Sequence, residues 1–302
     1  MKTDSILTDR QTNVPNTTIN RLIFHNRAVL RNDSKIVLAE KNQVNLNAWI
    51  TNTSTHNNIG DYLSLLIVSH LCRKHGLELA MPVKHTKHLY AIGSILPSYQ
   101  DATVWGSGFG YDKPAKWYSP IYNWFHRTMH TLDIRAVRGP ETRRILTEMG
   151  INCPEVYGDP AVLMPLFYQS KTERNQRDYI VIPHYSKLAD YKAQPNILGT
   201  FTSNHLDFID RLLEAKLVIS ASLHGIILAE AYGIPAVMLK DTPSKDITKY
   251  KDWYYSTGRM SFPIANSVEE ALNMGGTPLE YHVIEQMQEA LLNTFPADLW
   301  DV

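Results

Sequence analysis

A short polar step within residues 219–239, ISASLHGIILAEAYGIPAVML, holds the residue types needed to bind an anion and move a proton. The segment predicts an apolar strand, the polar step, a helix and a second strand. A helix start offers unpaired N–H groups and a positive dipole end, which suit a phosphate or carboxylate. We therefore expect Ser222, Leu223 and Gly225 to bind substrate. His224 is the expected acid or base, because imidazole exchanges protons near neutral pH. A capped helix with a buried, satisfied histidine is the alternative interpretation.

Other turns that end predicted strands also carry glycine or polar residues. In parallel α/β sheets, ligands bind beyond the carboxyl ends of strands, so these turns are expected to contribute to the same site. Each also has a purely structural interpretation, as a tight turn, a helix cap, a surface ion pair or a core histidine. The candidates are Gly60, Asp61, Ser107, Gly108, Arg138, Asp159 and His184.

The elements that must position these residues alternate between strand and helix. The expected strands, two of which include the turn that follows, lie at 45–50, 102–110, 134–138, 153–163, 179–185, 217–220 and 234–239. The expected helices lie within 57–76, 140–150, 203–215, 223–233, 267–274 and 279–293. Such alternation predicts parallel sheets with helices on both faces. The wholly polar stretch 169–178 predicts a linker.

The expected fold class is therefore α/β, with two doubly wound, Rossmann-like domains facing a cleft. The first domain is expected at 20–168, on the acceptor side. The second is expected at 179–302, with the donor anion site and a last helix that packs back on the first domain.

Composition narrows the function classes. The 302 residues include 30 basic and 30 acidic side chains, so no net field attracts nucleic acid. Two cysteines suggest neither a disulfide framework nor a zinc pattern, and HTKHL at 85–89 reads as a surface segment without a third metal ligand. The first twenty residues lack a signal peptide's apolar run, and no apolar stretch is long enough to span a membrane. We expect a cytoplasmic protein, with association at the inner membrane face left open, and no metal.

The ordered series of motifs resembles the polysaccharide pyruvyl transferase family. The matching pieces, within residues 45–260, are NNIGDYLS, WGSGFG, AVRGPETRRILTEMGI, VYGDPAVLMP, VIPHYS, ISASLHGIILAEAYGIPAVML and KDWYYSTGR. The resemblance implies a GT-B-like architecture and transfer of a pyruvyl group from phosphoenolpyruvate to a sugar of a surface polysaccharide. The partners it implies are phosphoenolpyruvate and an oligosaccharide or lipid-linked saccharide, without a redox cofactor.

The resemblance also suggests roles for residues. Some relatives carry an arginine two residues before the motif histidine, where this chain has Ser222. Another cation must then bind the donor's charge, and the candidates are Arg138, Lys249 and Arg259. Asp61 is expected to orient an acceptor hydroxyl or take its proton. Three aromatic residues could stack on a sugar: Trp253, Tyr254 and Tyr255. Of these, we expect Tyr255 to bind substrate.

Two other functions remain open from the sequence. A GT-B glycosyltransferase that uses a nucleotide sugar would have the same fold, and Glu230 could hold the ribose. A non-enzymatic sugar- or phosphate-binding protein of hinge type would also have two domains. Such proteins are usually exported, and the missing signal argues against this reading.

Overall fold

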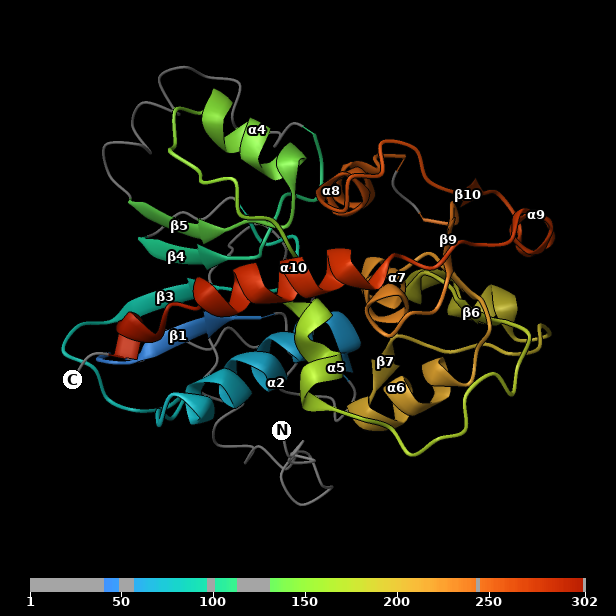
Figure 1. The fold of residues 1–302 in the computed structure, drawn as a ribbon, viewed down its shortest axis with the longest axis horizontal. Helices are drawn as coiled ribbons and strands as arrows, with labels where there is room; N and C mark the ends of the chain where they lie inside the picture. The colour runs from blue at the N-terminus through green and yellow to red at the C-terminus, as the bar shows by residue number, and fades with distance from the viewer. Residues whose placement is uncertain (1–40, 49–56, 97–100, 113–130, 243–244, 301–302) are drawn as a thin grey trace.

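The computed structural model describes residues 41–48, 57–96, 101–112, 131–242 and 245–300. These residues contain two four-stranded parallel sheets, and Figure 1 shows how the helices lie around them. The first sheet has the order β1 (Val44–Asn47), β3 (Lys87–Tyr90), β4 (Ala102–Trp105), β5 (Leu132–Ala136). The second has the order β10 (Ile264–Ala265), β9 (Ala236–Leu239), β8 (Val218–Ser220), β6 (Ile180–Ile182). The predicted mixed α/β class with parallel sheets is confirmed. The division into two domains stays a prediction, and its start at residue 20 lies outside the described residues.

Helices connect the strands and cover the sheets (Figure 1). The α-helices are α2 (Ile59–Lys74), α4 (Pro140–Glu148), α5 (Met164–Phe167), α6 (His205–Leu213), α7 (Leu223–Ala231), α8 (Thr248–Ser256), α9 (Val268–Met274) and α10 (Tyr281–Asn293). Short 3₁₀ turns form η1 (Pro160–Leu163), η2 (Tyr185–Tyr191) and η3 (Ala297–Trp300). A small antiparallel pair joins β2 (Asn57–Asn58) to β7 (Phe201–Thr202).

The helix ends follow from local chemistry. Asn58 caps α2, since its side chain accepts a 3.0 Å hydrogen bond from the N–H of Gly60. Pro140 opens α4, where a missing N–H is tolerated, and Gly150 follows the helix with φ 74°. Ser267 caps α9, because its hydroxyl accepts a 3.1 Å hydrogen bond from the N–H of Glu270.

Two predictions of local structure were wrong. Residues 153–163 form no ladder strand; a single bridge joins Tyr157 to Val137, and the chain then turns into η1. The HTKHL segment is not merely surface, because β3 runs between β1 and β4. Its polar first half conceals the strand, while Leu89 and Tyr90 are buried.

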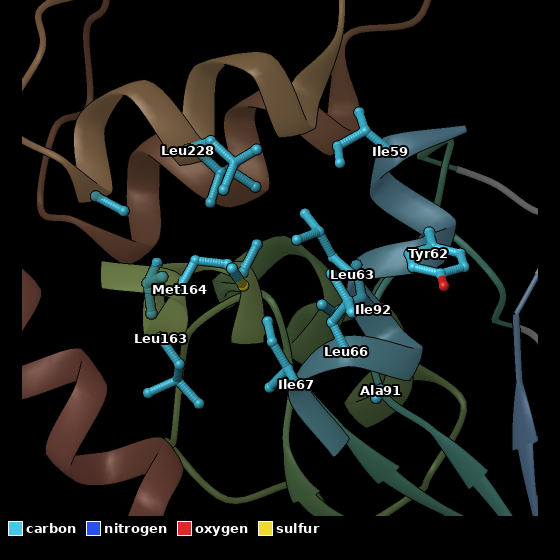
Figure 2. Packing of buried hydrophobic residues seen from close by; sticks show 14 of the residues in the cluster. Ile59, Tyr62, Leu63, Leu66, Ile67, Ala91, Ile92, Leu163, Met164 and Leu228 are labelled. Carbon is cyan, nitrogen blue, oxygen red and sulfur yellow. The ribbon is translucent and has the colours of Figure 1, made fainter. Parts of the chain in front are cut away.

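One hydrophobic core extends between the sheets. Figure 2 shows Leu63 and Ile67 of α2 beside Leu163 and Met164, with Leu228 of α7 above them. Helix α10 lies across the middle of the molecule in Figure 1, where Leu291 accepts a hydrogen bond from Trp105 (3.0 Å). Cys72 belongs to this core and Cys153 to a smaller apolar cluster beside β4 and β5, and burial raises the pKa of both thiols to about 12. Both cysteines are therefore unreactive core residues.

Candidate functional site

The centre of the site is the place where α2 and α7 begin. Gly60 is the second residue of α2, and His224 is the second residue of α7. A Cβ added to Gly60 would lie only 1.9 Å from Nδ1 of His224, so the imidazole rests directly against the glycine backbone. Two helix dipoles therefore point their positive ends at one imidazole, which favours a negatively charged ligand there.

Asp159 lies on the other side of the imidazole. Its Oδ2 is 3.5 Å from Nε2 of His224. The carboxylate has no exposed surface, whereas the His224 side chain keeps 15% of its surface exposed. Gly158, at φ 150°, permits this turn and packs so tightly that a Cβ would meet Met287 of α10 at 2.6 Å. The structure thus brings together Gly60, Asp159 and His224 from three separate turns of the sequence.

The polar step before α7 is held by Ser220, a residue outside the predicted site. Its hydroxyl donates to the carbonyl of Ser222 (2.8 Å) and accepts from the Ser222 N–H (3.0 Å). The Ser222 side chain makes no cap bond to α7, so it does not occupy the first N–H groups of the helix. Gly225 serves packing, because a Cβ there would lie 2.5 Å from the Ser220 hydroxyl and 2.9 Å from Ile182. The predicted anion-binding roles of Ser222, Leu223 and Gly225 remain predictions.

Helix α8 brings a positive charge toward this step. The Tyr250 hydroxyl donates to the carbonyl of Ala221 (2.7 Å), and Nζ of Lys249 lies 5.0 Å from the centre of the Tyr250 ring. No carboxylate among the described residues forms an ion pair with Lys249. Burial, together with the positive charge of Arg138, lowers the pKa of Lys249 to about 8.

Arg138 needs a different interpretation from the predicted anion clamp. It is fully buried, and its Nε donates to Oδ2 of Asp252 at 3.1 Å. The other guanidinium nitrogens donate to Ser94 (2.9 Å) and to the carbonyl of Phe109. A guanidinium that is fully buried, with each of its three nitrogens bonded to the protein, does not present a surface to a ligand, so we assign Arg138 to structure.

Ser107 and Gly108 belong to the same structural turn. The Ser107 hydroxyl is buried and donates to the carbonyl of Ala91 (3.1 Å). Gly108 lies against Arg138, since a Cβ there would be 2.6 Å from Nη2. Nothing in this geometry directs either residue toward His224, and their binding roles stay untested predictions.

Arg259 is likewise paired. It makes two bonds to the carboxylate of Glu230, at 2.7 and 2.8 Å, and lies 4.5 Å from the centre of the Tyr254 ring. Trp253 Nε1 also donates to Glu230 (2.7 Å). Since Glu230 is buried and fully bonded, it is not placed to hold a ribose. Trp253 and Tyr254 have no exposed surface and cannot stack on a sugar.

The remaining predicted residues lie around this centre. Asp61 is half-buried in the first turn of α2, directly after Gly60. Tyr255 is partly exposed on α8. His184 follows β6, the neighbour of β8 in the sheet, and its Nδ1 lies 2.8 Å from the Ser186 hydroxyl. Their catalytic or binding roles remain predictions.

An aromatic group next to His184 was missed from the sequence. The rings of Tyr185 and Phe201 meet edge to face with centres 5.6 Å apart, and each residue is 42% exposed. Phe201 is paired in register with Asn58, the cap of α2. The VIPHYS motif drew attention to His184, but the pairing of β7 with β2 could not be read from single segments.

Asp252 was also missed, although its position carries a signal. It lies next to Trp253 in a segment rich in aromatic residues, where a carboxylate that becomes buried needs a partner.

Within the part of the chain that the structure describes, no three histidine, cysteine or acidic side chains form a group able to hold a metal ion. No described helix combines the length and apolar character of a membrane span.

The fold and the site define an α/β protein with a histidine at two converging helix starts. The polysaccharide pyruvyl transferase family model matches residues 58–241, more than half of the chain, and this protein belongs to that family. The matched residues include Gly60, Asp159 and His224.

The proteins similar to this chain include one curated relative and one solved structure. Succinoglycan biosynthesis protein ExoV from Rhizobium meliloti (strain 1021) is 28% identical over 226 residues. The match covers 68% of this chain and 63% of ExoV, so it spans less than two thirds of that relative. A crystal structure of an uncharacterized protein from Klebsiella pneumoniae subsp. pneumoniae NTUH-K2044 is 12% identical, with a TM-score of 0.42, over 74% of this chain and 93% of the other.

Proposed function

We propose that this chain transfers the enolpyruvyl group of phosphoenolpyruvate to a sugar of a polysaccharide or its precursor, forming a pyruvate ketal and releasing phosphate. The observation that carries this proposal is the position of His224 between the starts of α2 and α7. Phosphoenolpyruvate has two anionic groups and a carbon that must be protonated. Two positive helix ends with a proton-exchanging imidazole between them suit that donor.

The reaction proceeds in two additions. An acid gives a proton to the methylene carbon of the donor, and one sugar hydroxyl adds to the central carbon and loses its proton to a base. The bond from the central carbon to the phosphate oxygen then breaks, and a second hydroxyl takes that place and gives up its proton. The products are a methyl-bearing ketal and hydrogen phosphate. No step changes the overall oxidation level, so the proposal includes no redox cofactor.

Lys249 supplies the cation that the donor's charge requires. Of the three cations considered, Arg138 and Arg259 are bonded to buried carboxylates, and Lys249 alone among them has no ion pair with a described residue. Its position beside Tyr250, which bonds to Ala221, places it near the polar step before α7. An ammonium in a partly desolvated position attracts a phosphate or carboxylate more strongly than one in water.

The acceptor sugar is proposed to stack on Tyr185 and Phe201. These rings are exposed, unlike Trp253 and Tyr254, and the register of β7 with β2 places Phe201 beside the cap of α2. Two adjacent exposed aromatic rings offer a flat apolar surface against which one face of a sugar ring can pack. We also propose that the two sheets act as the two halves of a GT-B-like enzyme, with the reaction at their meeting point.

The nucleotide-sugar alternative loses its acidic residue in this structure. Glu230 is occupied by Arg259 and Trp253, so the ribose would need another partner. Binding of phosphoenolpyruvate but not of nucleotide sugars is therefore expected.

The test is incubation of the protein with labelled phosphoenolpyruvate and a panel of oligosaccharides that includes succinoglycan fragments. We expect phosphate release that depends on the acceptor, and a labelled ketal detected by mass spectrometry. The matched control is the His224→Gln protein. Transfer of a glycosyl group from a nucleotide sugar, with no product from phosphoenolpyruvate, would overturn the proposal.

A further inference from the structure

The buried carboxylate behind His224 has a role that its surroundings define. We propose that Asp159 is a positioning residue: its Oδ2 holds a proton on Nε2 of His224, so that Nδ1 is the nitrogen that exchanges protons with substrate. The identity of that substrate rests on the proposed function, but the pairing of the two side chains does not.

Two unsatisfied atoms carry the inference. Oδ1 of Asp159 accepts a 3.0 Å hydrogen bond from the N–H of Ala161 and thereby caps η1. Oδ2 is buried and has no hydrogen-bond partner, and Nε2 of His224 is buried and has none either. A buried carboxylate oxygen without a donor is costly. Since these atoms are 3.5 Å apart, a protonated Nε2 is the donor that satisfies both with a small movement of the ring.

The opposite nitrogen faces the start of α2. Nδ1 lies against Gly60, a residue with no side chain. Nε2 is buried, so the 15% of the His224 side chain that is exposed belongs to other atoms. With Nε2–H held by Asp159, a doubly protonated imidazole can give its Nδ1 proton to the methylene carbon of the donor. The neutral Nε2–H form that remains has a lone pair on Nδ1, which can accept the proton of the attacking hydroxyl.

This arrangement replaces the substrate-binding role that the sequence suggested for Asp159. A carboxylate with no exposed surface does not reach a ligand, and it would repel an anionic donor. Its negative charge instead stabilises the imidazolium that the first proton transfer requires, as buried carboxylates do behind catalytic histidines.

Asp159→Asn is the test variant, because it separates the two oxygens. The amide oxygen can still cap η1, while the amide nitrogen donates to Nε2 and forces the proton onto Nδ1. We expect kcat to fall ~10²–10⁴-fold, with the KM for phosphoenolpyruvate little changed and Tm preserved. In a His224→Gln background the same change should cause no further loss of turnover. Multiplying losses in the double variant, or full turnover by Asp159→Asn, would contradict the proposal.

A spectroscopic measurement tests the pair without donor or acceptor. In protein labelled with ¹⁵N-histidine, the His224 signals are identified by their absence in His224→Gln. At alkaline pH the neutral ring should show the Nε2–H tautomer, and Asp159→Asn should shift it toward Nδ1–H. An Nδ1–H tautomer in the unmodified protein overturns the proposal even if the variant fails to fold. If the tautomer is as expected but phosphoenolpyruvate is not turned over, the proposed function fails and the pair stands.

Discussion

At the scale of single residues, the charge of Lys249 lowers the stability of the folded protein and is proposed to bind phosphoenolpyruvate. Its pKa, lowered to about 8 by burial and by Arg138, means that folding disfavours the ammonium. The folded protein binds fewer protons than the unfolded chain between pH 8 and the usual lysine range. The free energy of unfolding therefore rises with pH across that window, and the burial cost is fully present below pH 8.

Lys249→Met should accordingly raise Tm at pH 7 while it raises the KM for phosphoenolpyruvate by ~10–100-fold, as expected for a lost charge-assisted hydrogen bond. In the unmodified enzyme, the same KM should rise as the pH passes through about 8, because the ammonium then loses its proton. Lys251→Met, on the same helix, is the control and should leave donor binding unchanged. A donor KM that ignores both the variant and the pH would exclude Lys249 from the site.

Gly60 provides a second test at this scale. A methyl group at this position would occupy the place of the imidazole, 1.9 Å from Nδ1 of His224. We expect Gly60→Ala to lower kcat ~10²–10⁴-fold in a folded protein, as loss of the histidine itself would. Gly110→Ala is the matched control, since a Cβ there meets nothing closer than 3.4 Å. Near-normal turnover of Gly60→Ala would show that the imidazole can move away without consequence.

At the scale of elements, a buried ion pair joins the turn before α4 to α8. Neither Arg138 nor Asp252 has an exposed side chain, and Asp252 also accepts bonds from the N–H (2.9 Å) and hydroxyl (2.7 Å) of Thr142. Asp252→Ala should cost ~3–5 kcal/mol of unfolding free energy, measured in urea, because it leaves the guanidinium buried and unpaired. Asp298→Ala breaks the exposed pair with Arg135 and should cost ~0–1 kcal/mol. Equal losses would contradict this reading.

The aromatic pair that borders α2 can be tested in the same way. Phe201→Ala and Tyr185→Ala should raise the KM for the acceptor several-fold and leave the KM for phosphoenolpyruvate unchanged, because only a stacking surface is removed. Tyr281→Ala, at a residue 71% exposed on α10, removes a comparable ring and should change neither constant. Parallel changes in both constants would point to a disturbed fold.

Individual helices and strands were easier to predict from the sequence than the tertiary contacts between them. The helix from Ile59 and the strand–turn–helix around His224 follow from their apolar segments and the polar residues between them, and the structure contains both. Strand β3 was missed because half of its residues are polar. Its place between β1 and β4 depends on tertiary structure, which a single segment of sequence does not show. For the same reason Arg138 was read as a ligand group: its carboxylate partner lies 114 residues further along the chain. The sequence marked Gly60, Asp159 and His224 separately, but it could not show that one imidazole lies between the other two.

At the scale of the whole molecule, the two sheets are joined by more than the polar stretch 169–178. One core contains residues of both sheets, and η1 and α5 contribute to it. The Tyr232 hydroxyl donates to the carbonyl of Tyr168 (2.9 Å), and the Gln288 amide donates to the carbonyl of Val162 (2.7 Å). The site at His224 depends on these contacts, because Asp159 and Gly60 come from one side of that stretch and the histidine from the other.

These contacts predict that the two fragments stay associated when the chain is cleaved within residues 169–178. With a specific protease site inserted after Thr172, in the exposed stretch, the cleaved protein should elute at its uncut size and unfold in one urea transition. The contacts of α10 hold the two pieces, since Met287 packs against Gly158 and Leu291 bonds to Trp105. Met287→Asp places a charge in that contact, so its cleaved form should separate while its uncut form remains one chain. Separation of the unmodified pieces, or two distinct transitions, would instead show that each sheet folds as an independent domain and that the contacts across His224 are secondary.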